Sequence, residues 1–387
     1  MKKILIVGSG AKAYALAKRF TNEGHEVFCA PQNTDIREDK PEELLKFALE
    51  NSVNLTVVCS RTAIKSDIAT IFRENEQLIF APGANSANFA INKGAGKKFL
   101  YRQQIPTPKF GIFEKQPLAA DYIKTACLPV IIRTEESGSQ MMCPTLAIAN
   151  TFIDDLFFRG EKKIIIEDYT YGHEFTFYVL TDGFHAVPLV SAASYKFMSE
   201  GGGGLLTQGI GTFAPDYKVS FETENILLNR VFDILEIQTN YSGILGIECT
   251  LKEDESLTVT GFTPFLQDHD CQAVLNLIDE SLYSLFESCA VGSFADDCER
   301  VNISDNSSVS CMLFASSDAK EITGLDEESE DIIPLNIKDG KTVKGKTMLV
   351  TKTAATLSRA CKNLYEEIDS INYEGKKFRK DICKIIG

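Results

Sequence analysis

Short apolar runs alternate with amphipathic segments along the first 90 residues. Four runs have the pattern of buried strands: 3–7, 26–30, 54–60 and 77–81. Three segments between them have the spacing of amphipathic helices: 11–23, 41–51 and 65–75. Strands that alternate with helices predict a parallel sheet with helices packed against it. We therefore expect residues 1–90 to form a Rossmann-like, doubly wound α/β domain.

The pattern becomes mixed between residues 91 and 300. It predicts a helix at 93–104 and one long amphipathic helix at 272–291. Asp182-Gly183, between two apolar runs, is typical of a tight hairpin. Further strands are expected at 109–113, 130–133, 163–169, 174–180, 186–191, 242–251 and 257–262. We expect a second domain here, with a small lobe at about 109–180.

The last region, residues 301–387, is expected to be a small α+β domain. Its apolar runs at 309–315 and 348–352 predict strands, and residues 354–368 have helical spacing.

Composition and charge narrow the functional classes. The chain has 40 Lys and Arg against 54 Asp and Glu, a net charge of −14, which argues against a protein that binds nucleic acid through a basic surface. No apolar run reaches the roughly 18 residues of a membrane-spanning helix, so we expect no membrane contact. The short apolar start at 3–7 does not resemble a signal peptide, and a cytoplasmic protein is expected. The 11 cysteines include no C-x-x-C pair, which favours reduced thiols over a disulfide framework or a zinc site.

A glycine turn follows the first predicted strand. Residues 8–13 read G-S-G-A-K-A, the spacing of a turn that faces a pyrophosphate at a helix N-terminus. A nicotinamide dinucleotide site also needs an acid at the end of the second strand. The second predicted strand ends at residue 30 without one, and the first acid after it is Asp35. The alternatives are thus a tight packing turn or a different phosphate contact.

The same turn and a later lysine helix carry a resemblance. Residues 8–16 (GSGAKAYAL) and 92–100 (NKGAGKKFL), the latter followed by I-P-T, resemble G-x-G-G-R-E-H-A-L and S-K-x-x-x-K-x-F-L. These motifs belong to the phosphoribosylamine–glycine ligase family of ATP-grasp enzymes. The resemblance implies that Gly10 and Lys12 contact substrate and that Lys97 contacts the ATP phosphates. A solvated helix face is the alternative for Lys97.

A hinge motif strengthens the resemblance. Residues 166–174 (IEDYTYGHE) match the family's V-E-E-[FY]-x-x-G-x-E, which implies that Glu167 and Asp168 lie beside adenine and that Glu174 holds the ribose. Arg133 stands where the family has a lysine, and the resemblance implies a catalytic role for this residue. The phosphate flap at 135–140 lacks the family's G-K-G core. A polar strand–turn–strand is the alternative for the hinge.

The substrate loop is partly retained. Lys196, Gly209 and Gly211 match the family's loop, in which Lys196 would act in catalysis and the two glycines would contact substrate. The glycine run at 201–204 is open to a second interpretation, as a flexible lid or linker.

The metal motif departs from the family. Its E-F-N is G-F-T at residues 261–263, so both usual ligands are replaced. Residues 243–248 (GILGIE) resemble other ATP-grasp branches, in which this glutamate ligates metal. We therefore expect Glu248 with Asp268, or with Asp270, to bind Mg²⁺. The alternative is that Glu248 is an ordinary strand residue and metal binding is lost.

These observations predict an α/β protein with a Rossmann-like N-terminal domain, an ATP-grasp core with a clamping lobe, and a C-terminal α+β domain. The resemblance implies an ATP-dependent ligase that joins phosphoribosylamine and glycine through an acyl phosphate in purine synthesis. Small molecules would be its only partners, and the protein would be a monomer or homodimer. Two alternatives remain: a non-catalytic homologue that binds nucleotide or protein, and a different ATP-dependent carboxylate–amine ligase.

Overall fold

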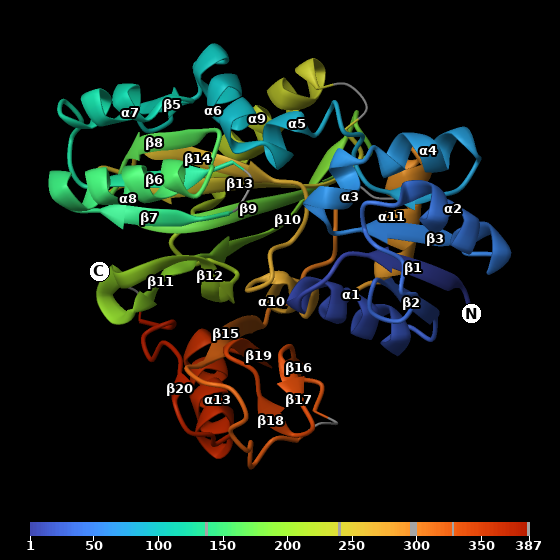
Figure 1. Cartoon of the computed structure of the whole chain (residues 1–387). Coiled ribbons are helices and arrows are strands. Elements are labelled where there is room, and N and C mark those ends of the chain that lie inside the picture. The colour runs from blue at the N-terminus through green and yellow to red at the C-terminus, as the bar shows by residue number, and fades with distance from the viewer. Residues whose placement is uncertain (136–137, 239–240, 295–299, 327–328, 385–387) are drawn as a thin grey trace.

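The N-terminal region is a four-stranded parallel sheet flanked by helices (Figure 1). In the order β2-β1-β3-β4, its strands are Glu26–Ala30, Lys3–Val7, Leu55–Val58 and Ile79–Phe80. Its helices are α1 (Ala11–Asn22), α2 (Pro41–Glu50), α3 (Arg61–Lys65) and α4 (Ile68–Glu74). The apolar run of β1 is fully buried, as expected for the central strand of such a sheet. The short helix α3 was not expected; Ser60 caps it by accepting a hydrogen bond from the Ala63 N–H.

The computed structural model describes residues 1–135, 138–238, 241–294, 300–326 and 329–384. Within these ranges, no helix is both long enough and apolar enough to cross a membrane.

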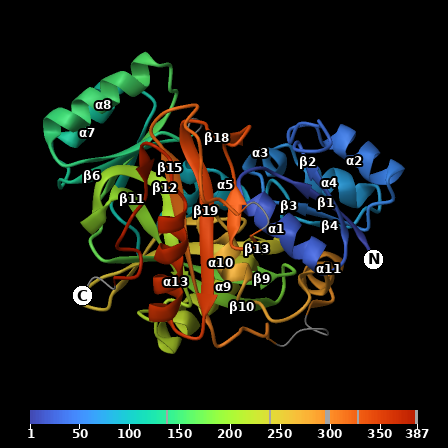
Figure 2. The ribbon, with the colours of Figure 1, turned by 90° about the horizontal axis from the view of Figure 1, so that it is seen from below.

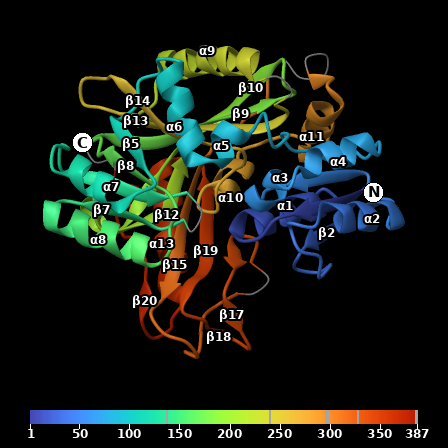
Figure 3. The same ribbon diagram turned by 45° about the horizontal axis from the view of Figure 1, so that its top comes forward.

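Two helices lead from the N-terminal region into the lobe (Figure 3). They are α5 (Asn88–Ile91) and α6 (Lys93–Arg102). The lobe is an antiparallel sheet in the order β5-β8-β6-β7, formed by Phe110–Phe113, Ile164–Asp168, Val130–Thr134 and Gln140–Cys143. Helices α7 (Gln116–Ile123) and α8 (Leu146–Phe158) pack on it. Because side chains alternate along β8, Ile164 and Ile166 face these helices, whereas Ile165 and Glu167 face the opposite side.

The central sheet has the order β10-β9-β13-β14. Its strands are Ala186–Ala193, His173–Thr181, Gly243–Leu251 and Leu257–Thr263. The expected hairpin is present, since Thr181 pairs with Ala186, and α9 (Phe221–Ile237) packs against β10.

The prediction of a single long helix at 272–291 is wrong. The structure has α10 (Cys271–Leu275) and α11 (Leu282–Val291). Between them Ile278 forms a bridge with Ile303, and Ser281 caps α11 by accepting a hydrogen bond from Ser284. The apolar periodicity continues across the break because both helices bury their faces in the same core.

The C-terminal sheet incorporates a strand pair from the middle of the chain. Its order is β11-β12-β15-β19-β16, formed by Tyr195–Ser199, Gly203–Ala214, Ser307–Ala315, Gly345–Ala354 and Ile332–Pro334. Figure 2 shows α13 (Leu357–Ser370) lying along β15 and β19. The smaller elements are η1 (Glu200–Gly202), the hairpin of β17 (Ile337–Lys338) with β18 (Lys341–Thr342), and β20 (Lys376–Lys377), which pairs with β15. The glycine run at 201–204 is therefore the turn between β11 and β12 rather than a linker.

One pair of cysteines differs from the expectation of reduced thiols. Cys361 on α13 and Cys383 near the C-terminus form a disulfide, with 6.1 Å between their Cα atoms. It is the only disulfide among the residues that the structure describes. Because the two partners are 22 residues apart, a search for C-x-x-C spacing does not find them.

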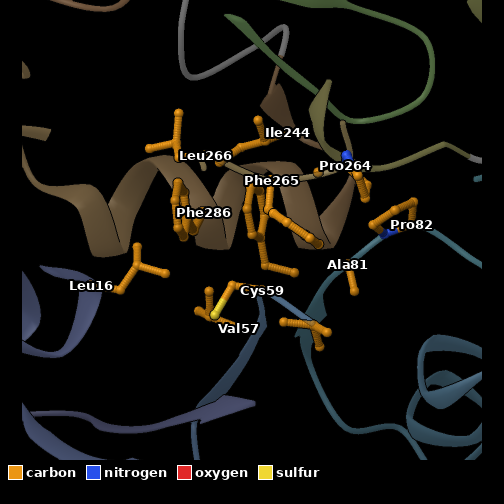
Figure 4. A pocket seen from close by; sticks show the side chains of 13 residues that line it. Leu16, Val57, Cys59, Ala81, Pro82, Ile244, Pro264, Phe265, Leu266 and Phe286 are labelled. Carbon is orange, nitrogen blue, oxygen red and sulfur yellow. The ribbon is translucent and has the colours of Figure 1, made fainter. Parts of the chain in front are cut away.

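The N-terminal sheet packs on the central region through an apolar contact. Figure 4 shows Leu16, Val57 and Cys59 facing Leu266 and Phe286 around a small pocket. No charged side chain lines this pocket. It is therefore the packed junction of two regions, and the polar chemistry lies elsewhere.

Candidate functional site

Three polar cavities lie where the lobe, the N-terminal region, the central sheet and the C-terminal sheet meet. The central cavity has six charged side chains: Arg61, Lys93, Lys97, Arg133, Glu167 and Glu248. The N-terminal cavity is lined by residues that include Lys12, Arg61, Gly209, Asp268, His269 and Lys346. The outer cavity includes Tyr169, Glu174, Lys196, Phe197, Gly202 and Arg379. Arg61 lines both the central and the N-terminal cavity, so these two cavities are neighbours.

Glu167 is clamped between two cations in the central cavity. Its carboxylate lies 2.5 Å from the Lys97 ammonium and 2.7 Å from Nε of Arg133. Glu167 is only 2 % exposed. Burial would raise its pKa, but Arg133 and Lys97 outweigh burial and hold the pKa at about 2. The carboxylate therefore fixes the two cations from α6 and β6 in the cavity, and both its oxygens are already engaged.

A second ionic group joins the central and outer cavities. The Lys196 ammonium lies 3.0 Å from Glu174 and 3.8 Å from Glu248. Although burial opposes its charge, these two carboxylates raise the pKa of Lys196. Gln267 also donates a hydrogen bond of 3.3 Å to Oε1 of Glu248. Burial opposes the charge of Glu248 too, but Lys196 and other nearby cations keep its pKa below the usual value.

Two cations in the central cavity were missed by the sequence prediction. Lys93 begins α6, and none of the carboxylates that the structure describes pairs with its ammonium. Burial, then Arg133 and Arg61, lowers the pKa of Lys93 to about 7. Arg61 donates hydrogen bonds to the carbonyls of Ala90 (3.2 Å) and Ile91 (3.3 Å).

The N-terminal cavity is built around Asp268. The carboxylate of Asp268 lies 3.2 Å from the Lys12 ammonium and 3.4 Å from that of Lys346. It also accepts a 3.3 Å hydrogen bond from the Lys12 N–H. Gly10 has a φ of +84°, and a Cβ there would lie 2.7 Å from Oδ1 of Asp268. Only glycine therefore allows the turn and the carboxylate to approach so closely.

Gly209 lines the same cavity, and a close contact requires glycine here too. It has a φ of +126°, and a Cβ at this position would collide with the ring of His269. His269 is fully buried, and burial followed by the charges of Lys196 and Lys346 lowers its pKa to about 3. A neutral imidazole therefore forms one wall of the cavity.

The expected site residues are distributed unevenly. The structure brings Lys97, Arg133, Glu167 and Glu248 together, places Glu174 and Lys196 beside them, and gathers Gly10, Lys12 and Gly209 around Asp268. It places three other features elsewhere. Asp168 alternates away from Glu167 along β8 and lines none of the three cavities. Gly211 faces Ile382, since a Cβ at this position would meet that side chain. Asp268 and Glu248, the expected pair of metal ligands, line different cavities. Only part of the phosphate flap can be placed, because residues 136–137 lie outside the described ranges.

The residues do not fit the Mg²⁺ site that the family pattern implies. In the described ranges, no group of three or more His, Cys, Asp or Glu side chains is placed to hold a metal ion. Gly261 and Thr263 stand at the positions of the usual ligands. Asp270, the other expected ligand, is fully buried and accepts a 2.7 Å hydrogen bond from the Tyr178 hydroxyl. Glu248 is thus the one carboxylate of the expected set that lines the central cavity, and it already faces Lys196.

A clamping lobe, a central antiparallel sheet and a buried cationic cavity between them define an ATP-grasp protein. Sequence comparison gives the particular family. The profile of the "Phosphoribosylglycinamide synthetase, N domain" matches residues 2–89, and that of the "Phosphoribosylglycinamide synthetase, ATP-grasp (A) domain" matches residues 91–271. The chain belongs to the phosphoribosylglycinamide synthetase family, which confirms the resemblance and the fold class expected from the motifs.

Individual relatives agree with this assignment. A phosphoribosylamine–glycine ligase of Clostridium acetobutylicum is 28 % identical, with 99 % of each chain covered. The solved structure of the phosphoribosylamine–glycine ligase of Thermotoga maritima is similar, with a TM-score of 0.80 and 22 % identity over 98 % of this chain and 99 % of that one. A biotin carboxylase domain of Hydrogenobacter thermophilus has the same fold, with a TM-score of 0.74 and 14 % identity over 97 % and 91 % of the two chains. That structure contains ADP, its magnesium salt and bicarbonate.

Proposed function

We propose that this protein is an ATP-dependent ligase that joins glycine to phosphoribosylamine in purine synthesis. One observation carries the proposal: a cavity with four cationic side chains adjoins a second cavity with two lysines, and Arg61 lines both. Such an arrangement suits a triphosphate beside a phosphorylated amine, because Lys and Arg are the usual partners of phosphate oxygens. Membership of the phosphoribosylglycinamide synthetase family supports the choice of substrates.

The reaction would proceed in two displacements. A carboxylate oxygen of glycine attacks the γ-phosphorus of ATP, the bond from phosphorus to the bridging oxygen breaks, and ADP leaves. The amine nitrogen of phosphoribosylamine then attacks the acyl carbon of glycyl phosphate. The C–O bond to phosphate breaks, inorganic phosphate leaves, and the nitrogen loses a proton. No protein nucleophile is required, so catalysis rests on positioning and charge neutralisation.

The side chains divide this work by cavity. Lys97 and Arg133 face the triphosphate, and Glu167 keeps both in place. Glu174, in the outer cavity, is positioned to accept hydrogen bonds from ribose hydroxyls, and Lys196 beside it faces the reacting carboxylate. Lys12 and Lys346 would bind the phosphate of phosphoribosylamine in the N-terminal cavity, where Gly10 and Gly209 leave room.

A second function has one observation in its favour. Because Gly261 and Thr263 remove the usual metal ligands, a homologue that binds nucleotide without turnover would keep the same cavities. ADP formation separates the two candidates. The ligase forms ADP in repeated turnovers only when ATP, glycine and phosphoribosylamine are all present, because without the amine the acyl phosphate is not consumed. Arg133→Ala lowers kcat. A homologue without turnover binds ATP and forms no ADP in the complete mixture.

A further inference from the structure

Lys196 lies on the edge strand of the C-terminal sheet, at a point where regular pairing is interrupted. Strand β11 has β12 as its neighbour in this sheet. Tyr195 pairs with Gly211 but Phe197 pairs with Leu206, so the register shifts between the two residues that flank Lys196. Such an irregularity disrupts the ladder of backbone hydrogen bonds and re-aims side chains. The ladder therefore does not by itself fix the direction in which Lys196 points.

Arg379, near the C-terminus, contacts both neighbours of Lys196. Its guanidinium donates a hydrogen bond of 3.0 Å to the Phe197 carbonyl. The central carbon of the guanidinium lies 4.9 Å from the centre of the Tyr195 ring. Arg379 is only 2 % exposed, so solvent weakens these contacts little. One side chain thus holds the residue before Lys196 and the residue after it.

Asp381 orients this guanidinium and reaches the turn between β11 and β12. Its two carboxylate oxygens lie 2.7 Å from Nε and 2.6 Å from Nη2 of Arg379, a double hydrogen bond that fixes the plane of the guanidinium. The same carboxylate accepts a 3.0 Å hydrogen bond from the Gly201 N–H. Burial opposes the charge of Asp381, but Arg379 and the Gly201 N–H keep its pKa below the usual value. The ion pair therefore persists at neutral pH.

The segment that carries the ion pair is fastened to α13 and to β12. The Tyr365 hydroxyl on α13 donates a 3.2 Å hydrogen bond to the Arg379 carbonyl and accepts one of 3.1 Å from the Ile382 N–H. The disulfide to α13 follows at the next residue. Ile382 lies on Gly211 of β12, where a Cβ would be 2.3 Å from Cδ1 of Ile382. Gly211, which the resemblance assigns to substrate contact, therefore leaves room for the C-terminal segment.

We propose that Arg379 and Asp381 are positioning residues for the ligase reaction, which aim the Lys196 ammonium at the reacting carboxylate. The two side chains bond to each other and to the backbone of the β11–β12 hairpin, so they act through Lys196. The ammonium lies 3.0 Å from Glu174 and 3.8 Å from Glu248, and a small movement of β11 changes both distances. The inference rests on the role of Lys196 in the proposed function.

The reactivity of Lys196 towards an amine-acylating reagent tests the positioning without turnover. In the full-length protein, 11 % of the Lys196 side chain is exposed and its ammonium is paired, so it should react slowly. Arg379→Lys keeps a positive charge beside Asp381 but lacks the planar fork that serves several partners at once. It should raise the labelling rate of Lys196, measured by peptide mass spectrometry, roughly tenfold, as expected when a charged hydrogen bond is lost. An unchanged rate in the folded variant overturns this inference and leaves the ligase assignment intact.

A matched control and a second variant make the labelling test specific. Lys380→Gln is the control, because Lys380 is an exposed cation between Arg379 and Asp381, and its loss should leave the labelling of Lys196 unchanged. Tyr195→Leu removes the ring beneath the guanidinium and should raise the labelling rate as Arg379→Lys does. Thermal unfolding midpoints verify that the variants are folded, and Tyr195→Leu decides the outcome if Arg379→Lys does not fold. An equal rise in the control contradicts the proposal.

Steady-state kinetics test the consequence for catalysis. Arg379→Lys should lower kcat roughly tenfold to a hundredfold through misalignment. The KM for phosphoribosylamine should not change, because Lys12 and Lys346 line a different cavity. In a Lys196→Met background the same substitution should change kcat less than about twofold, since its effect passes through the missing ammonium. Equal losses in both backgrounds overturn the proposal. If the labelling changes as expected but the original protein shows no turnover, the proposed function fails and the positioning of Lys196 stands.

Discussion

Replacing Glu167 with glutamine removes the anion at the centre of the cationic cavity. The pKa of Glu167 is held at about 2 instead of 4.5. At about 1.36 kcal/mol per pKa unit, this difference corresponds to roughly 3 kcal/mol of folding free energy near neutral pH. Glu167 is 2 % exposed, so solvent screens this interaction little. Glutamine also leaves Lys97 and Arg133 buried without a counter-charge, and breaking a buried pair costs about 3–5 kcal/mol.

Urea denaturation measures this loss. Glu167→Gln should lower the unfolding free energy of the ligand-free protein by about 3–5 kcal/mol with an unchanged m-value. The neighbouring Asp168→Asn is the control. Burial raises the pKa of Asp168, so its charged form is disfavoured in the folded state and the substitution should be neutral or slightly stabilising.

The sign of the pH dependence gives an independent check. A folded-state pKa below the unfolded value stabilises the protein above pH 4.5 and loses that effect as the pH falls towards 2. The difference between the original protein and Glu167→Gln should therefore shrink over this range. A loss below about 0.5 kcal/mol at neutral pH, within the range of ordinary surface substitutions, would refute the clamp.

Three further predictions concern the other parts of the site and the fold. Lys12→Ala should raise the KM for phosphoribosylamine roughly tenfold through loss of a charged hydrogen bond, whereas the exposed Lys46→Ala should not; equal KM values would contradict the assignment of the N-terminal cavity. A thiol reductant should lower the unfolding free energy by about 3 kcal/mol, because it opens the loop between Cys361 and Cys383. The unfolding free energy of Cys383→Ser should not change with the reductant. An original protein that is equally insensitive to the reductant would contradict the disulfide. The pKa of Lys93 is about 7, which burial, Arg133 and Arg61 lower and Glu248 and Glu167 raise. ATP binding above pH 7 should therefore take up a proton, because the bound anion restores the charge of Lys93. Calorimetry in buffers of different ionisation enthalpy measures this uptake, which Lys93→Met should abolish.

Local patterns were sufficient to predict the elements that carry the site. The spacing from Glu167 to Glu174 predicted a strand, a turn and a second strand, and the structure has β8 and β9 there. The lysine helix and the Asp182-Gly183 hairpin were also predicted correctly. Such features depend on residues close in the chain, where capping, turn chemistry and alternation act directly.

Features that depend on distant segments could not be predicted in this way. The clamp on Glu167 joins α6, β6 and β8, so nothing in the 166–174 motif shows that its carboxylate faces two cations. The hinge pattern suggested adjacent roles for Glu167 and Asp168, but strand alternation separates them. Strand β12 was interpreted as a glycine-rich loop, although it pairs with its neighbour β11; its second partner, β15, lies about 100 residues further along the chain and could not be foreseen.

The transfer of oxygen from glycine to phosphate tests the central claim most directly. Glycine labelled with ¹⁸O in both carboxylate oxygens is supplied with ATP and phosphoribosylamine, and the released phosphate is analysed by mass spectrometry. Because the carboxylate oxygen attacks phosphorus and leaves with it, each phosphate should carry one ¹⁸O atom. Unlabelled phosphate, formed by attack of water on ATP, or no phosphate from a protein that binds ATP, would contradict the ligase assignment.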